Sequence, residues 1–173
     1  MKTFNFYLYW VIALALITVS ACKKDDDDPA NYISIFDKNY TLSKGYISDY
    51  IENANSTYNY RVFLMTDSLD YNLVSGGLIG KGTVIFMEIN TSSPGGITSG
   101  TYNYSDTGNA FTFKAEIGLE TAFTGGGGGM LVIIAGGSID IVVDGQETEF
   151  ILDLTTNNNK KVTGRFKGNL TEI

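Results

Sequence analysis

The feature that most constrains this chain is the alternation of apolar and polar side chains in short segments separated by turn residues. In residues 110–120 the apolar side is formed by Phe111, Phe113, Ala115, Ile117 and Leu119, and the polar side by Thr112, Lys114, Glu116 and Glu120. A period of two is typical of a β-strand with one face in the core and one in water. Similar segments recur from Tyr32 onward, between clusters of Gly, Asn, Asp and Ser. The pattern predicts an all-β fold, an antiparallel β-sandwich, with an up-and-down, lipocalin-like β-barrel as the alternative.

The last two segments predict a hairpin of defined register. Its inward side chains are Phe150, Leu152 and Leu154 on one strand and Val162 and Phe166 on the next. A loop centred near Asn158 places Phe150 opposite Phe166, Leu154 opposite Val162, and Glu149 opposite Lys167. A slip of one residue would turn the whole apolar set into water, so the register should be strongly held. Upstream, Ile139, Ile141 and Val143 alternate with Asp140 and Asp144, and Asp144-Gly145 indicates a turn.

The middle segments are apolar on both sides. Phe63 and Met65 alternate with Val62 and Leu64, and Val84 and Phe86 alternate with Ile85 and Met87. Such strands are covered on both faces, or they leave an apolar surface for a ligand or partner. A barrel that encloses a ligand would line its internal cavity with residues such as Phe63 and Met65, whereas a sandwich would be filled.

Composition excludes several classes of function. The 173 residues include 12 basic and 19 acidic side chains, and this net charge of -7 argues against nucleic acid as a partner. Histidine is absent and Cys22 is the only cysteine, so disulfides and Cys-His or Ser-His catalysis are excluded. Asp140, Asp144, Glu149 and Asp153 favour a solvated face with cross-strand ion pairs over a catalytic carboxylate pair. We predict no enzyme, no cofactor and no metal site.

The start of the chain has the pattern of an export signal. Lys2 precedes an apolar run over residues 10–19, and small residues follow at Ser20 and Ala21. Val19-Ser20-Ala21-Cys22 resembles the lipobox of bacterial lipoproteins. The resemblance implies a signal peptide over residues 1–21 and a lipidated Cys22, which carries a diacylglycerol thioether and becomes the acylated N-terminus. The alternative is a cleaved secretory signal followed by an unmodified thiol.

The residues after Cys22 are highly charged: Lys23, Lys24, Asp25, Asp26, Asp27 and Asp28. This run resembles the export tether of Bacteroidetes lipoproteins that reach the outer face of the outer membrane. The resemblance implies an outer-membrane protein exposed at the cell surface, with a tether over residues 22–30 and one all-β domain over residues 31–173. Retention on the periplasmic leaflet is the alternative, since any block of like charges forms a solvated spacer.

The order of segments in the body also resembles a class of small Bacteroidetes surface lipoproteins. The resemblance rests on "NYISIFDKNYTLSKGY", "SGTYNYSD", "GGSIDIVVDGQETEFILDLTT" and "KKVTGRFKGNL". It implies an all-β domain and no particular activity. In addition, Asp67-Ser68-Leu69 resembles the acceptor for O-glycans on exported Bacteroidetes proteins, which implies glycosylation of Ser68.

Tyrosine is the remaining candidate for recognition, because its ring suits sugars and its hydroxyl forms hydrogen bonds. Tyr58, Tyr60, Tyr102 and Tyr104 are candidate contacts for a glycan or a partner, although tyrosine also suits half-buried strands. We therefore expect a lipid-anchored cell-envelope protein with a non-enzymatic binding or accessory surface domain. Its partners would be the membrane, through the anchor, and a glycan or another envelope protein. The alternatives are a small-ligand-binding β-barrel and a carboxylate-dependent glycan hydrolase.

Overall fold

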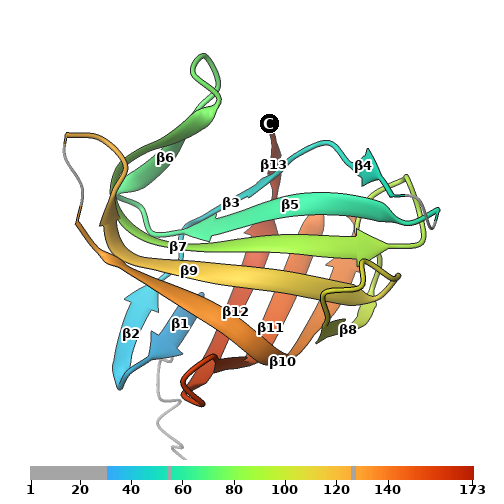
Figure 1. Cartoon of the computed structure of the whole chain (residues 1–173). Helices are drawn as coiled ribbons and strands as arrows, with labels where there is room; N and C mark the ends of the chain where they lie inside the picture. Colours follow the sequence, from blue (N-terminus) through green and yellow to red (C-terminus); the bar gives the residue numbers. More distant parts are fainter. Residues whose placement is uncertain (1–30, 54–55, 126–127) are drawn as a thin grey trace, which may run out of the picture.

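The computed structural model describes residues 31–53, 56–125 and 128–173, and these form strands without any helix (Figure 1). The predicted all-β class is confirmed. The strands are β1 (Tyr32–Ile35), β2 (Lys38–Thr41), β3 (Lys44–Ile47), β4 (Ile51–Glu52), β5 (Tyr58–Met65), β6 (Leu69–Asn72), β7 (Gly77–Thr91), β8 (Gly100–Tyr104), β9 (Thr112–Ala122), β10 (Met130–Asp144), β11 (Glu147–Thr156), β12 (Lys161–Asn169) and β13 (Thr171–Glu172).

All the described strands belong to one sheet that folds over itself into two layers. Its order is β13-β3-β5-β7-β9-β8-β10-β11-β12-β1-β2, with β4 paired to β5 and β6 paired to β7. In Figure 1, β5, β7 and β9 form the front layer, and β11 and β12 cross behind them. The pairing is mostly antiparallel, but β8–β9 and β3–β13 are parallel, so the sheet is mixed rather than purely antiparallel.

Strand β10 carries the sheet from one layer to the other. Its first residues pair with β9, and residues further along pair with β8 and β11. The register shifts between Ile134 and Gly136, and Gly137 has a φ of 107°, which side chains other than glycine rarely adopt. An irregularity of this kind bends a strand and increases its twist. The Gly136-Gly137 pair therefore lets β10 turn the corner.

The two ends of the sheet meet where β12 leads into β13. Only Leu170 separates these strands, and β13 pairs with β3 through Thr171 and Tyr46. A β-carbon added at Gly45 of β3 would lie 2.6 Å from Leu170 Cδ2 and 2.9 Å from Phe166 Cζ. A side chain at this point of β3 would force the side chains of Leu170 and Phe166 to move. The architecture is therefore intermediate between a sandwich of two separate sheets and a closed barrel.

The space between the layers is filled by apolar side chains. Tyr102, Phe113, Phe150 and Phe166 are the largest of them, and the rings of Phe150 and Phe166 lie 6.4 Å apart between centroids. Phe63 and Met65 lie instead on the outer face, where Met65 packs with Leu69 and Val84 in a second, smaller cluster. A ligand-enclosing barrel would have placed Phe63 and Met65 on an internal cavity, but β5 turns its other side, with Val62 and Leu64, to a filled core.

The predicted register of the last hairpin is confirmed. Phe150 lies opposite Phe166, Leu154 opposite Val162, and Glu149 opposite Lys167. The alternation along β9 is also confirmed from Phe113 to Leu119. Phe111 differs from the prediction: it precedes β9, has a φ of 59°, and exposes its ring. Val143 is likewise exposed, because it lies close to the turn that ends β10.

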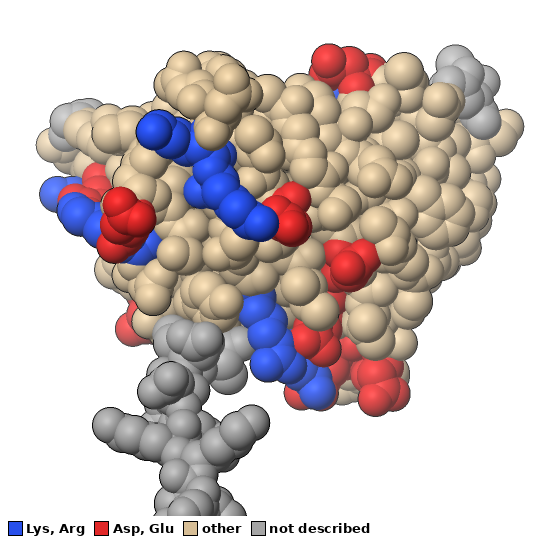
Figure 2. Space-filling model, turned by 90° about the horizontal axis from the view of Figure 1, so that it is seen from below, with Lys and Arg blue, Asp and Glu red and all other residues tan. Residues whose placement is uncertain are grey.

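The outer face of β11 and β12 carries cross-strand ion pairs, as predicted, but Glu149 pairs with Arg165 and not with the opposite Lys167. Glu149 binds Arg165 at 2.6 Å, Asp153 lies 3.2 Å from Lys161, and Glu147 lies 3.5 Å from Lys167. In a view from below, Figure 2 likewise shows basic and acidic side chains next to one another rather than in patches of one sign.

The leader, Cys22 and the charged tether of Lys23, Lys24 and Asp25 to Asp28 lie outside the described residues. Within the residues that the structure describes, no helix is long and apolar enough to span a bilayer. Every strand and core residue described here lies between Tyr32 and Glu172. A chain begun at Cys22 or Lys23 thus keeps all of these contacts.

The hairpin register predicts a large difference between neighbouring substitutions. Phe166→Ala should lower the free energy of unfolding by about 3 to 5 kcal/mol, because it removes buried area and leaves a cavity. Lys167→Ala should cost less than about 1 kcal/mol, because its ion pair is exposed. Urea unfolding of residues 23–173 measures both, and a Lys167 variant less stable than the Phe166 variant would overturn the strand assignment.

Candidate functional site

A groove runs along the outer face of β5, β7 and β9, on the side turned away from the core. It consists of three adjoining hollows with volumes of about 430, 270 and 390 Å³. The first two hollows share Glu88, Asp106 and Lys114, and the last two share Phe86 and Glu116. Because of these shared walls we treat them as one site, the outer groove. Its lining changes along the strands from amides, through charges, to apolar side chains.

The amide end of the outer groove is built around Asn90 of β7. The Asn90 side-chain oxygen accepts hydrogen bonds from Nδ2 of Asn59 at 3.0 Å and of Asn53 at 3.2 Å, and its nitrogen donates to Thr112 Oγ1 at 3.2 Å. Asn90 is only 3% exposed, so this network is fixed. Among the described residues, no donor binds the side-chain oxygens of Asn53 and Asn59. Within this part of the chain, both oxygens can accept hydrogen bonds from a ligand.

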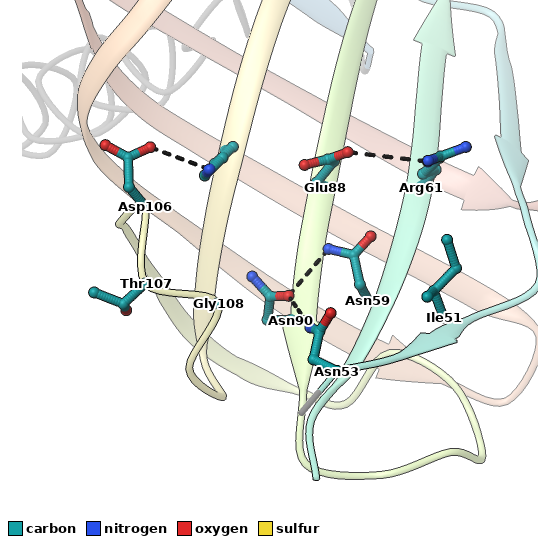
Figure 3. Close-up of a pocket in the computed structure, with 10 residues that line it drawn as sticks. Ile51, Asn53, Asn59, Arg61, Glu88, Asn90, Asp106, Thr107 and Gly108 are labelled. Carbon is teal, nitrogen blue, oxygen red and sulfur yellow. Dashed lines mark hydrogen bonds and ion pairs between the residues drawn. The ribbon is translucent and has the colours of Figure 1, made fainter. Parts of the chain in front are cut away.

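A loop closes this end of the groove. Thr57 Oγ1 donates to the carbonyl of Gly108 at 2.8 Å and accepts from Asn53 Nδ2 at 3.2 Å. These bonds join the turn before β5 to the segment between β8 and β9. Asp106 and Thr107 are thereby held beside the asparagines, as Figure 3 shows.

The middle of the outer groove is a row of alternating charges. Glu88 lies opposite Arg61 of β5 and opposite Lys114 of β9 in the strand registers. Arg61 Nε lies 3.9 Å from Glu88, as drawn in Figure 3, and Lys114 Nζ lies 3.3 Å from Asp106. Exposed pairs of this kind add little to stability. They place two cations and two carboxylates in the middle of the outer groove.

The other end of the outer groove is apolar. Phe63 of β5 lies opposite Phe86 of β7, with 5.2 Å between ring centroids. Leu78 of the β6–β7 hairpin forms one wall, and Phe123 and Leu131 of the β9–β10 hairpin form the other. The sequence left open whether the second apolar face of these strands is covered. The β6–β7 hairpin buries Met65 and Val84 but leaves a strip of apolar surface beside Phe86.

The β6–β7 hairpin is fastened to β3 by one polar cluster. The Tyr46 hydroxyl donates to Asp70 Oδ1 at 2.6 Å, and Lys44 Nζ lies 3.5 Å from Asp70 Oδ2. The hydrogen bond from Tyr46 is the main cause that holds the pKa of Asp70 below its usual value, and the Tyr71 N–H and Lys44 act in the same direction. The same hydrogen bond, with burial and the charge of Asp70, raises the pKa of Tyr46.

The predicted tyrosine contacts are not a shared exposed face. Tyr102 is 0% exposed, and Tyr60 is 5% exposed with its hydroxyl donating to the Pro94 carbonyl at 2.7 Å. Burial is the main cause that raises the pKa of Tyr60. Tyr58 and Tyr104 are half-buried and pack against the core. The prediction is wrong for Tyr60 and Tyr102, because their rings point into the core, and only Tyr104 contributes to the outer groove.

Ser68 lies exposed in the turn between β5 and β6, with its Oγ 3.4 Å from Thr66 Oγ1. Its glycosylation stays a prediction. Of the four carboxylates singled out from the sequence (Asp140, Asp144, Glu149 and Asp153), none lines the outer groove. Sequence reasoning missed Asn53, Asn59 and Asn90. Asparagine is depleted in strands. The presence of Asn59 in β5 and Asn90 in β7 was therefore the sequence signal that could have identified this site.

Comparison with protein-family models, with curated proteins and with solved structures finds no match for this chain. The outer groove is therefore interpreted from its own chemistry.

The cluster at Asp70 predicts a pH-dependent contribution to stability. A carboxyl whose pKa is lowered by folding stabilises the fold above its unfolded pKa, and the contribution is lost as the pH falls through the folded pKa. Asp70→Asn should therefore be less stable than the parent at pH 7, and the difference should shrink below about pH 4. Urea midpoints at several pH values measure this. Asp67→Asn, in the turn that precedes β6, is the matched control. A stability difference between Asp70→Asn and the parent that does not change with pH would contradict the assignment.

Proposed function

We propose that this chain is a lipid-anchored protein of the bacterial cell envelope whose β domain binds a glycan in the outer groove without chemical turnover. The observation that carries the proposal is the fixed amide network around Asn90. Among the residues that the structure describes, it leaves the oxygens of Asn53 and Asn59 open beside two cations and two carboxylates. Hydroxyl groups of a sugar both donate and accept hydrogen bonds, so this mixture of acceptors and donors suits them.

The apolar end of the groove supports the same ligand class. A sugar ring has an apolar face, and the half-buried rings of Phe63 and Phe86 offer an aromatic surface for it. The outward residues of β7 from Asn90 to Val84 span about 20 Å at about 3.3 Å per residue. This length suits several sugar units in a row better than a single small molecule.

Binding is favoured over hydrolysis by the partners of the carboxylates. A glycosidase needs one carboxylic acid and a second carboxylate, both directed at the scissile bond. Glu88 and Asp106 are instead each paired with a cation of the groove. The small-ligand barrel is not favoured, because Tyr102, Phe113, Phe150 and Phe166 occupy the space between the layers.

The envelope location is supported by the sequence of the leader. Cys22, the only cysteine, ends the lipobox, and the Lys-Asp run follows directly. We infer a position on the outer membrane with the domain exposed at the cell surface, where polysaccharide is abundant. The tether of Lys23, Lys24 and Asp25 to Asp28 would direct this export.

The amide network gives a direct test of glycan binding. Residues 23–173 should be retarded in native gels that contain a polysaccharide extracted from bacterial envelopes. Asn59→Ala should weaken the retardation about ten-fold, the value of roughly one hydrogen bond. Asn39→Ala, which removes an exposed asparagine from β2, is the matched control and should migrate like the parent. Equal retardation of all three proteins would place any binding outside the outer groove.

The anchor is tested separately. Cys22→Ser should block lipidation and move the full chain from the detergent phase to the aqueous phase in a detergent-partitioning experiment on cell extracts. Stable anchoring takes more than one acyl chain, which the cysteine would carry. If the variant stays in the membrane fraction as fully as the parent, the lipoprotein assignment is wrong.

A further inference from the structure

An exposed aromatic residue occupies the tip of the β1–β2 hairpin. Phe36 and Asp37 form a two-residue turn with φ values of 51° and 60°, and Phe36 is 44% exposed. Turns with two positive φ values strongly favour Asn and Gly. A bulky side chain there is an outlier, and such outliers are concentrated at functional sites. The local conformation and the exposed ring therefore both require an explanation.

Lysines surround this tip. Phe36 lines a hollow of about 480 Å³ together with Lys160 and Lys161 from the β11–β12 turn. Lys38 begins β2 on the other side of the tip. Lys161 is 3.2 Å from Asp153, whereas Lys38 and Lys160 form no ion pair within the described part of the chain. Asp37 is the acidic residue of the tip itself.

The anchor places this tip within reach of a membrane. Asn31 is fixed in the fold, because its side chain accepts from the Lys167 N–H at 2.6 Å and donates to the Lys167 carbonyl at 3.0 Å. Nine residue steps separate Cys22 from Asn31, which span at most about 30 Å. The tip lies five steps beyond Asn31, about 16 Å along β1. A lipidated Cys22 thus keeps Phe36 close to the headgroups.

We propose that the β1–β2 tip is a second contact with the bilayer, in which the Phe36 ring enters the boundary between headgroups and acyl chains and Lys38, Lys160 and Lys161 lie against lipid phosphates. This inference rests on the proposed lipid anchor. One aromatic ring and three lysines bind a membrane weakly on their own. A short tether raises their effective concentration at the surface, and the weak contact is then occupied.

This contact fixes the orientation of the domain. In Figure 1 the β1–β2 hairpin lies at the lower left, whereas β5 and β7 cross the upper part of the front layer. With the tip on the membrane, the outer groove on these strands remains open to a ligand.

The composition of residues 22–173 allows this contact to be tested with a single tryptophan and a single coupling site. Residues 22–173 contain no tryptophan and one cysteine, because Trp10 precedes them. Cys22 can be coupled to a maleimide lipid in vesicles of phosphatidylcholine and phosphatidylglycerol, which replaces the biological anchor. Phe36→Trp then gives a single fluorescent reporter at the tip. Phe123→Trp, at an exposed phenylalanine on the wall of the outer groove, is the matched control, and circular dichroism checks that both variants keep the parent fold.

On coupling, emission of the tryptophan at position 36 should shift to the blue and should be quenched by lipids brominated on their acyl chains. The tryptophan at position 123 should do neither. Replacing Lys38, Lys160 and Lys161 by Gln should reduce the quenching at position 36. Unchanged emission at position 36 would overturn the contact, and so would an equal response at position 123 or a blue shift that appears without vesicles at high protein concentration. Because coupling does not depend on lipidation in cells, this result is independent of the Cys22→Ser test.

Discussion

The structure depends on the packing that brings both ends of a single sheet around one core. Phe166 of β12 contacts Phe150 across the hairpin and lies under Gly45 of β3. Because Gly45 has no side chain, Leu170 and Phe166 pack directly against β3 at the point where β13 pairs with it. Burying a phenylalanine contributes about 1.5 to 3 kcal/mol, and at this position the burial also holds the two layers together.

This packing also fixes the position of the strands that form the outer groove. Ile85, Met87 and Ile89 of β7 are fully buried on the inner side, and they fix the strand on which Glu88 and Asn90 face outward. Polar groups on strands are more precisely held than groups on loops. Asn90 is an example, since its side-chain oxygen and nitrogen are all engaged by neighbours on β5, β9 and the turn before β5. The network would need no rearrangement before it meets the proposed ligand, and binding would lose little conformational entropy.

Sequence reasoning succeeded where the decisive contacts are local. The β11–β12 register follows from a short loop and from alternation on both sides, so Phe150 and Phe166 could be paired from the sequence. Tyr102 could not be placed in this way, because β8 pairs with β10 and, in parallel, with β9, and alternation says little about such distant partners. Gly136-Gly137 resembles a turn signal but lies inside β10. The outer groove was missed because it exists only when Asn59, Asn90 and Thr112 are in register across three strands.

The lining of the outer groove changes from amide to apolar side chains along the strands. This change would affect the direction in which a ligand binds. Exposed ion pairs such as Arg61–Glu88 are worth little as stabilising interactions, so a ligand can replace them at low cost. Arg61 and Lys114 are not equivalent in this role. The planar guanidinium of Arg61 can hold two neighbouring hydroxyls or a carboxylate in one plane, whereas the ammonium of Lys114 acts as a point charge. For the proposed ligand, the end near Asn59 and Arg61 would therefore set the orientation, because its donors and acceptors are directional. The surface at Phe63 and Phe86 would add affinity with little selectivity, since apolar contact is not directional. A chain-like ligand would accordingly enter in one direction, with its most polar unit against β5 and its remaining units laid along β7 toward Leu78.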